Sequence, residues 1–145
     1  MDNAQYCTFE LDQHVFGIPV GDVQEVLASQ RVRRVPGATS EVAGLLNLRG
    51  EIVTRLDLRP RLQLAATSTS EEPRLDMVVR TADGPVSLVV DAVGDVLSLG
   101  VEDLDEVPDT VPQALRSVVR AVHQAPDRLL LILDTATATC IVSAA

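Results

Sequence analysis

Short apolar runs, separated by turn residues about every ten positions, are the feature that most constrains the fold of this chain. Their length and their content of Val, Leu and Ile are typical of strands, and no long amphipathic helical pattern occurs. We expect strands at about 6–11, 15–20, 45–48, 52–58, 75–80, 86–90, 93–99, 115–122 and 129–133. Strands of this size at this spacing predict an all-β sandwich or small barrels.

Composition narrows the classes of partner and compartment. The chain has 145 residues, so it forms one domain or two small intimate ones, and its net charge is −9. An acidic surface repels phosphates, which argues against nucleic acids and anionic membrane surfaces as partners. The sequence has no signal peptide and no apolar run of membrane-spanning length, so we expect a cytoplasmic protein without membrane insertion. In that compartment Cys7 and Cys140 are expected to be reduced.

Motifs that carry catalysis or hold metals are missing from the sequence. It contains no G-x-S-x-G nucleophile turn and no phosphate-binding loop. The two histidines, His14 and His123, have no partner signature, and the acidic stretch 102–109 lacks the ligand spacing of a calcium loop. We therefore expect a protein without metals or cofactors that works through its surfaces, and an enzyme on a small barrel is the least favoured alternative.

A tight hairpin turn is expected at Arg49-Gly50-Glu51, where two apolar runs are interrupted. Gly50 supplies the backbone freedom that such a turn needs. The long side chain of Arg49 stands beside the bend and has two interpretations. It either reaches out toward a partner, or it pairs with Asp57 or Glu51 across the hairpin.

A short helix is expected after Gly21-Asp22, because Val23, Val26 and Leu27 recur at helical spacing and Asp22 is a good N-cap. The valine stripe on this helix faces either the core or an apolar partner. For Leu27 the core is the favoured interpretation.

Several motifs, taken together, resemble the CheW family of chemotaxis coupling proteins. In the segment 42–62, Asn-Leu-Arg-Gly is followed by Asp-Leu-Arg, with Asp57 eight residues after Arg49, and this is similar to the family signature. The segments 17–26, 35–36, 89–91 and 94–99 match the family in the same order and spacing, from about residue 6 to residue 134.

This resemblance implies a fold and a domain organisation. The fold is all-β, with two intertwined five-stranded SH3-like barrels and a few short helices. Residues 1–145 would form a single CheW-like domain. Within it, one barrel would contain about 13–74, and the other would contain 6–12 plus 75–145.

The resemblance also implies a non-enzymatic adaptor that couples methyl-accepting chemoreceptors to the histidine kinase CheA in signalling arrays. The cytoplasmic tip of the receptor would dock in an apolar groove lined by Cys7, Val20, Val23, Val26 and Val93. Coupling would depend on Glu25, Arg49 and Gly50. The regulatory domain of CheA would meet Val35, Pro36, Asp57 and Leu58, although a protected sheet edge without a partner is the alternative for these edge residues.

Two departures from the family pattern keep a second function open. Thr54 stands where the family usually has Pro, and Arg55 stands where it has an apolar residue. An Arg in a core strand is costly, so either the local register differs or Arg55 is exposed at an altered interface. The alternative function is a divergent regulatory or decoy module that binds only one of the two partners in an accessory chemosensory system.

Overall fold

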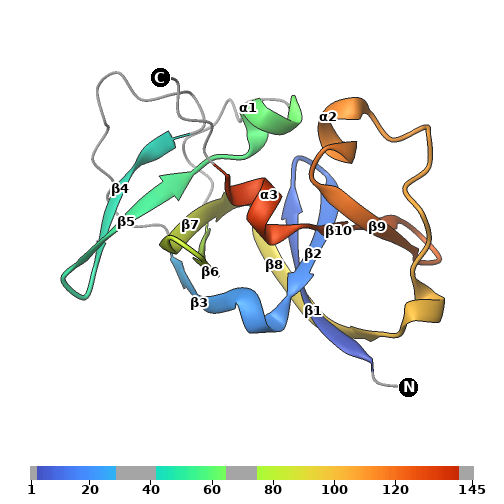
Figure 1. Ribbon diagram of the computed structural model, residues 1–145, viewed down its shortest axis with the longest axis horizontal. Coiled ribbons are helices and arrows are strands. Elements are labelled where there is room, and N and C mark those ends of the chain that lie inside the picture. Colours follow the sequence, from blue (N-terminus) through green and yellow to red (C-terminus); the bar gives the residue numbers. More distant parts are fainter. Residues whose placement is uncertain (1–2, 29–41, 65–74, 141–145) are drawn as a thin grey trace.

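The structure is a computed structural model that describes residues 3–28, 42–64 and 75–140 (Figure 1). Its strands are β1 (Ala4–Leu11), β2 (His14–Pro19), β3 (Val23–Ala28), β4 (Val42–Leu48), β5 (Glu51–Leu56), β6 (Leu75–Thr81), β7 (Gly84–Val90), β8 (Ala92–Leu99), β9 (Val119–Gln124) and β10 (Leu129–Leu133). Its short helices are η1 (Val20–Asp22), α1 (Arg59–Leu62), η2 (Val101–Asp103), α2 (Gln113–Arg116) and α3 (Thr135–Thr139).

The strands form two five-stranded sheets, which confirms the expected all-β fold with two small lobes. The first sheet has the order β8-β1-β2-β10-β9, and the second has the order β3-β6-β7-β5-β4. The chain therefore starts in the first sheet, builds the second and returns to the first (Figure 1). No helix in the described part of the chain is long and apolar enough to cross a membrane.

The sheets divide the chain differently from the expected barrels at 13–74 and at 6–12 plus 75–145. Strand β2 pairs with β1 and β10 in the first sheet, whereas β6 and β7 lie in the second. The reason is the tight turn between β1 and β2, where Asp12 and Gln13 both have left-handed φ angles of 47° and 68°. Such a two-residue turn returns the chain directly beside the strand that it has just left.

One hydrophobic core lies between the two sheets and is shared by both. Phe9 and Phe16 of the first sheet stack with ring centroids 5.5 Å apart and belong to the same buried cluster as Met77 and Leu88 of the second. All four side chains are fully buried. Burial of apolar area on this scale is what stabilises a small β protein, so the two lobes depend on each other for a large part of their core.

Two segments have a different secondary structure from the one expected. The segment from Val23 is strand β3 rather than a helix, because the edge of β6 offers backbone partners and pairs with it, as in Val26 with Met77. Only the preceding η1 is helical. The strand expected from residue 115 begins at Val119, because α2 occupies the positions after Pro112 and buries Leu115 in the core.

Candidate functional site

The side chains of Arg49 and Glu25 form a bidentate ion pair at one end of the second sheet. Arg49 Nη1 donates to Glu25 Oε2 at 2.5 Å, and Nη2 donates to Oε1 at 2.8 Å. Arg49 stands at the tip of the β4–β5 hairpin, and Glu25 lies in β3, which is the opposite edge strand of that sheet. The two expected coupling residues are therefore together, and Arg49 pairs with Glu25 rather than with Asp57 or Glu51.

The hairpin turn that presents Arg49 has the expected form. Leu48 pairs with Glu51, so Arg49 and Gly50 are the two turn residues, with φ angles of 52° and 85°. Both angles are left-handed, as a type I′ turn requires. A non-glycine residue in this region carries strain of about 1 kcal/mol, which the turn accepts at Arg49. The Asn47 side chain also accepts the Gly50 N–H at 3.0 Å, which holds the turn closed.

The electrostatics of the pair follow from this geometry. The hydrogen bonds from Arg49 lower the pKa of Glu25, and the pairing with Glu25 raises the pKa of Arg49. Both groups are therefore charged at neutral pH. The Arg49 side chain remains 71 % exposed although it is paired, whereas that of Glu25 is 18 % exposed. The outer side of the guanidinium is thus available to a partner.

Four of the five residues expected in the receptor groove gather at the shared core. Cys7 belongs to the buried cluster, and Val20, Val23 and Val93 are half-buried against it. Cys7 is only 8 % exposed and burial raises the pKa of its thiol, so it supports the surface from beneath instead of lining it. Val23 comes from the second sheet and Val93 from the first, so this apolar set spans both lobes.

The fifth residue, Val26, lies on the opposite face of β3. Burial alternates along this strand, so that Val23, Glu25 and Leu27 are half-buried while Val26 is 38 % exposed. The expectation that Val23 and Val26 share one face of a helical turn is therefore wrong, because side chains in a strand alternate between the two faces of the sheet. Val26 is one of two large apolar residues exposed in the described part of the second sheet, together with Ile52 at 62 %.

The residues expected to meet the kinase fall into three situations. Val35 and Pro36 lie outside the described residues. Asp57 is half-buried, and its Oδ1 accepts from the backbone N–H of Arg59 at 3.0 Å. Leu58 is 2 % exposed within the shared core, so its side chain supports the edge at Asp57 from within and does not lie on the surface.

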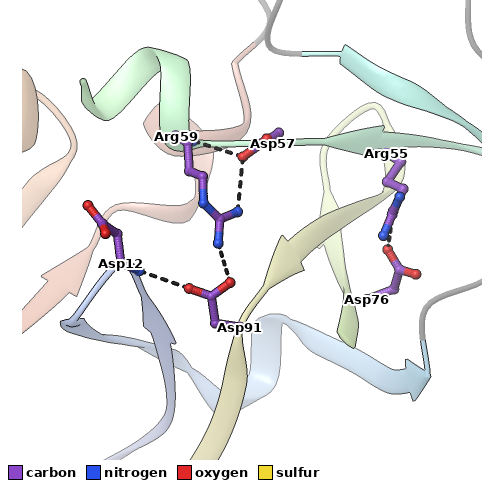
Figure 2. Close-up of polar contacts among 6 residues, drawn as sticks. All are labelled: Asp12, Arg55, Asp57, Arg59, Asp76 and Asp91. Atoms are coloured by element: carbon purple, nitrogen blue, oxygen red, sulfur yellow. Dashed lines mark hydrogen bonds and ion pairs between the residues drawn. The ribbon is translucent and has the colours of Figure 1, made fainter. Parts of the chain in front are cut away.

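The Arg55 side chain is only 12 % exposed, so it does not stand at an exposed interface, whereas the register of the β4–β5 hairpin does shift beside it, between Val42 and Gly44. Arg55 pairs with Gly44 across this hairpin, and its Nε donates to Asp76 Oδ1 at 2.6 Å (Figure 2). Asp76 is fully buried and also accepts from Ser87 Oγ at 3.0 Å. The Arg in the core strand is thus compensated by a buried carboxylate on a neighbouring part of the same sheet, a partner that the local sequence does not reveal.

Sequence reasoning missed a second buried arginine, Arg59, whose guanidinium contacts the carboxylates of Asp57 and Asp91 (Figure 2). Its side chain is 2 % exposed. The available signal was its place in the Asp-Leu-Arg part of the signature. This position alone does not indicate burial, because an Arg that follows a strand is ordinarily expected in solvent.

The histidines and acidic residues in the described part of the chain form no metal-binding group. No group of three His, Cys, Asp or Glu side chains there is placed to hold a metal ion. His14 Nδ1 lies 3.0 Å from the carbonyl oxygen of Asp12, and His123 Nδ1 lies 2.8 Å from that of Asp103. Both rings are thus held by backbone groups, which is a structural role.

Comparison with known proteins identifies related chains. A family model described as a CheW-like domain matches residues 5–138. The chain is 28% identical to the chemotaxis protein CheW of Treponema pallidum over 136 residues, which cover 92% of this chain and 80% of the relative. It is 28% identical to the chemotaxis protein CheW of Bacillus subtilis over 126 residues, which cover 87% and 80%.

A solved structure has the same fold. The scaffolding protein TtCheW from Thermoanaerobacter tengcongensis superposes with a TM-score of 0.84, covering 98% of this chain and 90% of that chain. The sequence identity of this pair is 22%, so the likeness concerns the fold alone.

Proposed function

Because this chain belongs to the CheW-like family, we propose that it couples methyl-accepting chemoreceptors to the histidine kinase CheA. Membership of this family makes it a chemotaxis adaptor rather than an enzyme. The finer proposal rests on the Arg49–Glu25 pair, in which the guanidinium of Arg49 is held by Glu25 at a hairpin tip and still faces solvent. A preorganised guanidinium of this kind can donate hydrogen bonds to a carboxylate of a partner and hold it in a defined orientation.

The proposed receptor surface is apolar and lies beside this pair. The half-buried side chains of Val20, Val23 and Val93 cover the core between the sheets. Val26 lies on the opposite face of β3, and because β3 is an edge strand, a receptor tip on Val23 reaches Val26 by extending over that edge. Small β-branched side chains form a shallow and rigid apolar surface, which suits the helical tip of a receptor. Binding there would recruit the adaptor to membrane-associated receptor arrays.

The proposed kinase surface is the edge at Asp57, and it would meet the regulatory domain of CheA; Val35 and Pro36, outside the described residues, stay part of this proposal. Leu58 supports this edge from the core. Each contact is expected to be modest, and assembly gains strength because receptor, adaptor and kinase are held together in many copies.

A module that binds one partner only is the second candidate function. The observation that favours it is that Asp57 is already engaged by Arg59 and Leu58 is buried, which leaves fewer free groups at the proposed kinase edge.

Pull-down with separated partners distinguishes the two candidates. The purified protein is incubated with receptor tip fragments or with the regulatory domain of CheA, and each complex is quantified. An adaptor binds both partners and a decoy binds one. Binding to neither would overturn both candidates. Arg116→Met is the control and is expected to bind as the unmutated protein does, because Arg116 pairs with Asp109 and neither residue belongs to the proposed surfaces.

A further inference from the structure

Arg59 is a buried cation that lies where the two lobes meet. It begins α1, directly after β5 of the second sheet, and its side chain is 2 % exposed. Its Nη1 donates to Asp57 Oδ1 at 3.4 Å, and its Nη2 donates to Asp91 Oδ1 (Figure 2). Its Nε has no hydrogen-bond partner in the described part of the chain. The two carboxylates are therefore the contacts that compensate its charge there.

Asp91 holds both lobes at once. It lies between β7 of the second sheet and β8 of the first, where the chain crosses from one to the other. While Oδ1 accepts from Arg59, Oδ2 accepts the backbone N–H of Asp12 at 2.9 Å (Figure 2). Asp12 stands in the turn between β1 and β2, and the N–H of Asp91 also donates to the carbonyl of Glu10 at 2.9 Å. A single carboxylate thus joins α1 to the first sheet.

A buried charge of this kind restricts geometry more than apolar packing does. An apolar interface tolerates small slides, because its attraction has no direction. Moving the lobes apart would instead leave the Arg59 guanidinium buried without Asp91, which is strongly unfavourable. The pair therefore selects one relative placement of the two sheets.

We propose that Arg59 is a positioning residue for coupling, which acts through Asp91 to fix the two sheets relative to each other. This inference rests on the proposed function, since the proposed receptor surface takes Val23 from the second sheet and Val93 from the first. When the sheets shift, the two halves of that surface no longer match one receptor tip. Arg59 itself, being buried, touches no partner.

The test measures the distance between the lobes in the purified full chain. Spin labels are placed on cysteines introduced at two exposed positions, Asp83 in the β6–β7 turn of the second sheet and Gln124 in β9 of the first, with Cys7 and Cys140 replaced by Ser. Asp91→Asn and Arg59→Met are expected to shift or broaden the distance distribution of the parent. If Arg59→Met does not fold, Asp91→Asn carries the test, because Asp91 is 30 % exposed and the substitution is isosteric.

Arg55→Met is the matched control, because it breaks a buried Arg–Asp pair that lies within the second sheet alone. It is expected to lower stability and to keep the parent distance distribution. An unchanged distribution in folded Asp91→Asn, or an equal change in Arg55→Met, would overturn the positioning role.

Coupling is measured in parallel. In reconstituted receptor–kinase assemblies, Asp91→Asn is expected to lower receptor control of the kinase by about tenfold, while its affinity for the isolated regulatory domain changes by less than about threefold. An equal loss in both assays would overturn the inference. If the unmutated protein binds neither partner, the proposed function fails, and the distance measurement alone still decides the role of Arg59.

Discussion

Arg49 and Glu25 stand 24 residues apart in the chain and join the two edge strands of one sheet through a bidentate ion pair. Among the described residues, β3 pairs with β6 and β4 pairs with β5, and no strand pairing joins β3 to β4. The pair therefore fixes the hairpin tip over β3 and orients the exposed guanidinium. The two residues proposed for coupling therefore form one unit.

Arg49→Glu is expected to remain folded, because the pair is exposed and contributes little to stability. Its ternary assembly with receptor and kinase is expected to fall by more than about tenfold, because the substitution places a second carboxylate beside Glu25 and removes the guanidinium. Co-sedimentation with receptor-containing vesicles measures this. The double exchange Glu25→Arg with Arg49→Glu restores an ion pair with reversed polarity. Assembly is expected to stay low in that variant, since a partner would meet a carboxylate at the tip. Normal assembly by Arg49→Glu alone would contradict the assignment.

The stabilising effect of the pair is expected to depend on pH. The folded state lowers the pKa of Glu25, so its contribution to stability is complete above the pKa of the unfolded chain and is lost as pH falls through the folded pKa. Urea unfolding of the protein and of Glu25→Gln is compared at neutral pH and below about pH 3. The difference between them is expected to be small at neutral pH, to shrink with salt and to vanish in acid. A difference that grew in acid would contradict this sign.

Leu58→Ala is expected to lower the free energy of unfolding by about 2–5 kcal/mol, because the side chain is fully buried in the shared core. Urea denaturation measures the loss. At equal concentrations of folded protein, affinity for the regulatory domain of CheA is expected to stay unchanged. A selective loss of kinase affinity without loss of stability would show that Leu58 contacts the kinase after all.

Val26→Asp is expected to change stability by less than about 0.5 kcal/mol, because the side chain projects from an edge strand into solvent. Its affinity for receptor tips is expected to fall by about tenfold, since a charge would enter an apolar contact. Titration calorimetry measures the affinity. Gln24→Asp is the control, because Gln24 is another exposed residue of the same strand. Equal weakening by both variants would point to charge repulsion over a distance rather than to contact at Val26.

Arg55→Met is expected to lower the free energy of unfolding by about 3–5 kcal/mol, because it removes a guanidinium that donates to the fully buried carboxylate of Asp76. Thermal and urea unfolding measure the loss. Arg80→Met removes an exposed Arg from the same sheet and serves as the comparison. A loss no larger than that of Arg80→Met would mean that Asp76 is compensated in another way.

Strands and tight turns were predictable because they depend on nearby residues. Alternation of apolar residues produces one buried face, and Gly50 permits the left-handed turn after Arg49. The same local logic failed at β3. The spacing of Val23, Val26 and Leu27 fits a helix as well as a strand. The free edge of β6 decided the outcome by supplying backbone partners that lie about fifty residues further along the chain.

By itself the sequence determined the all-β class, the hairpin that presents Arg49 and the lack of catalytic motifs, since these follow from residue type and short spacing. Tertiary structure alone decided which distant carboxylates meet Arg49, Arg55 and Arg59. Glu25 meets Arg49, Asp76 meets Arg55 and Asp91 meets Arg59, in every case across different strands or segments. The physical reason is that a charge is compensated by whatever the fold brings within a few ångströms, and sequence distance carries no information on that.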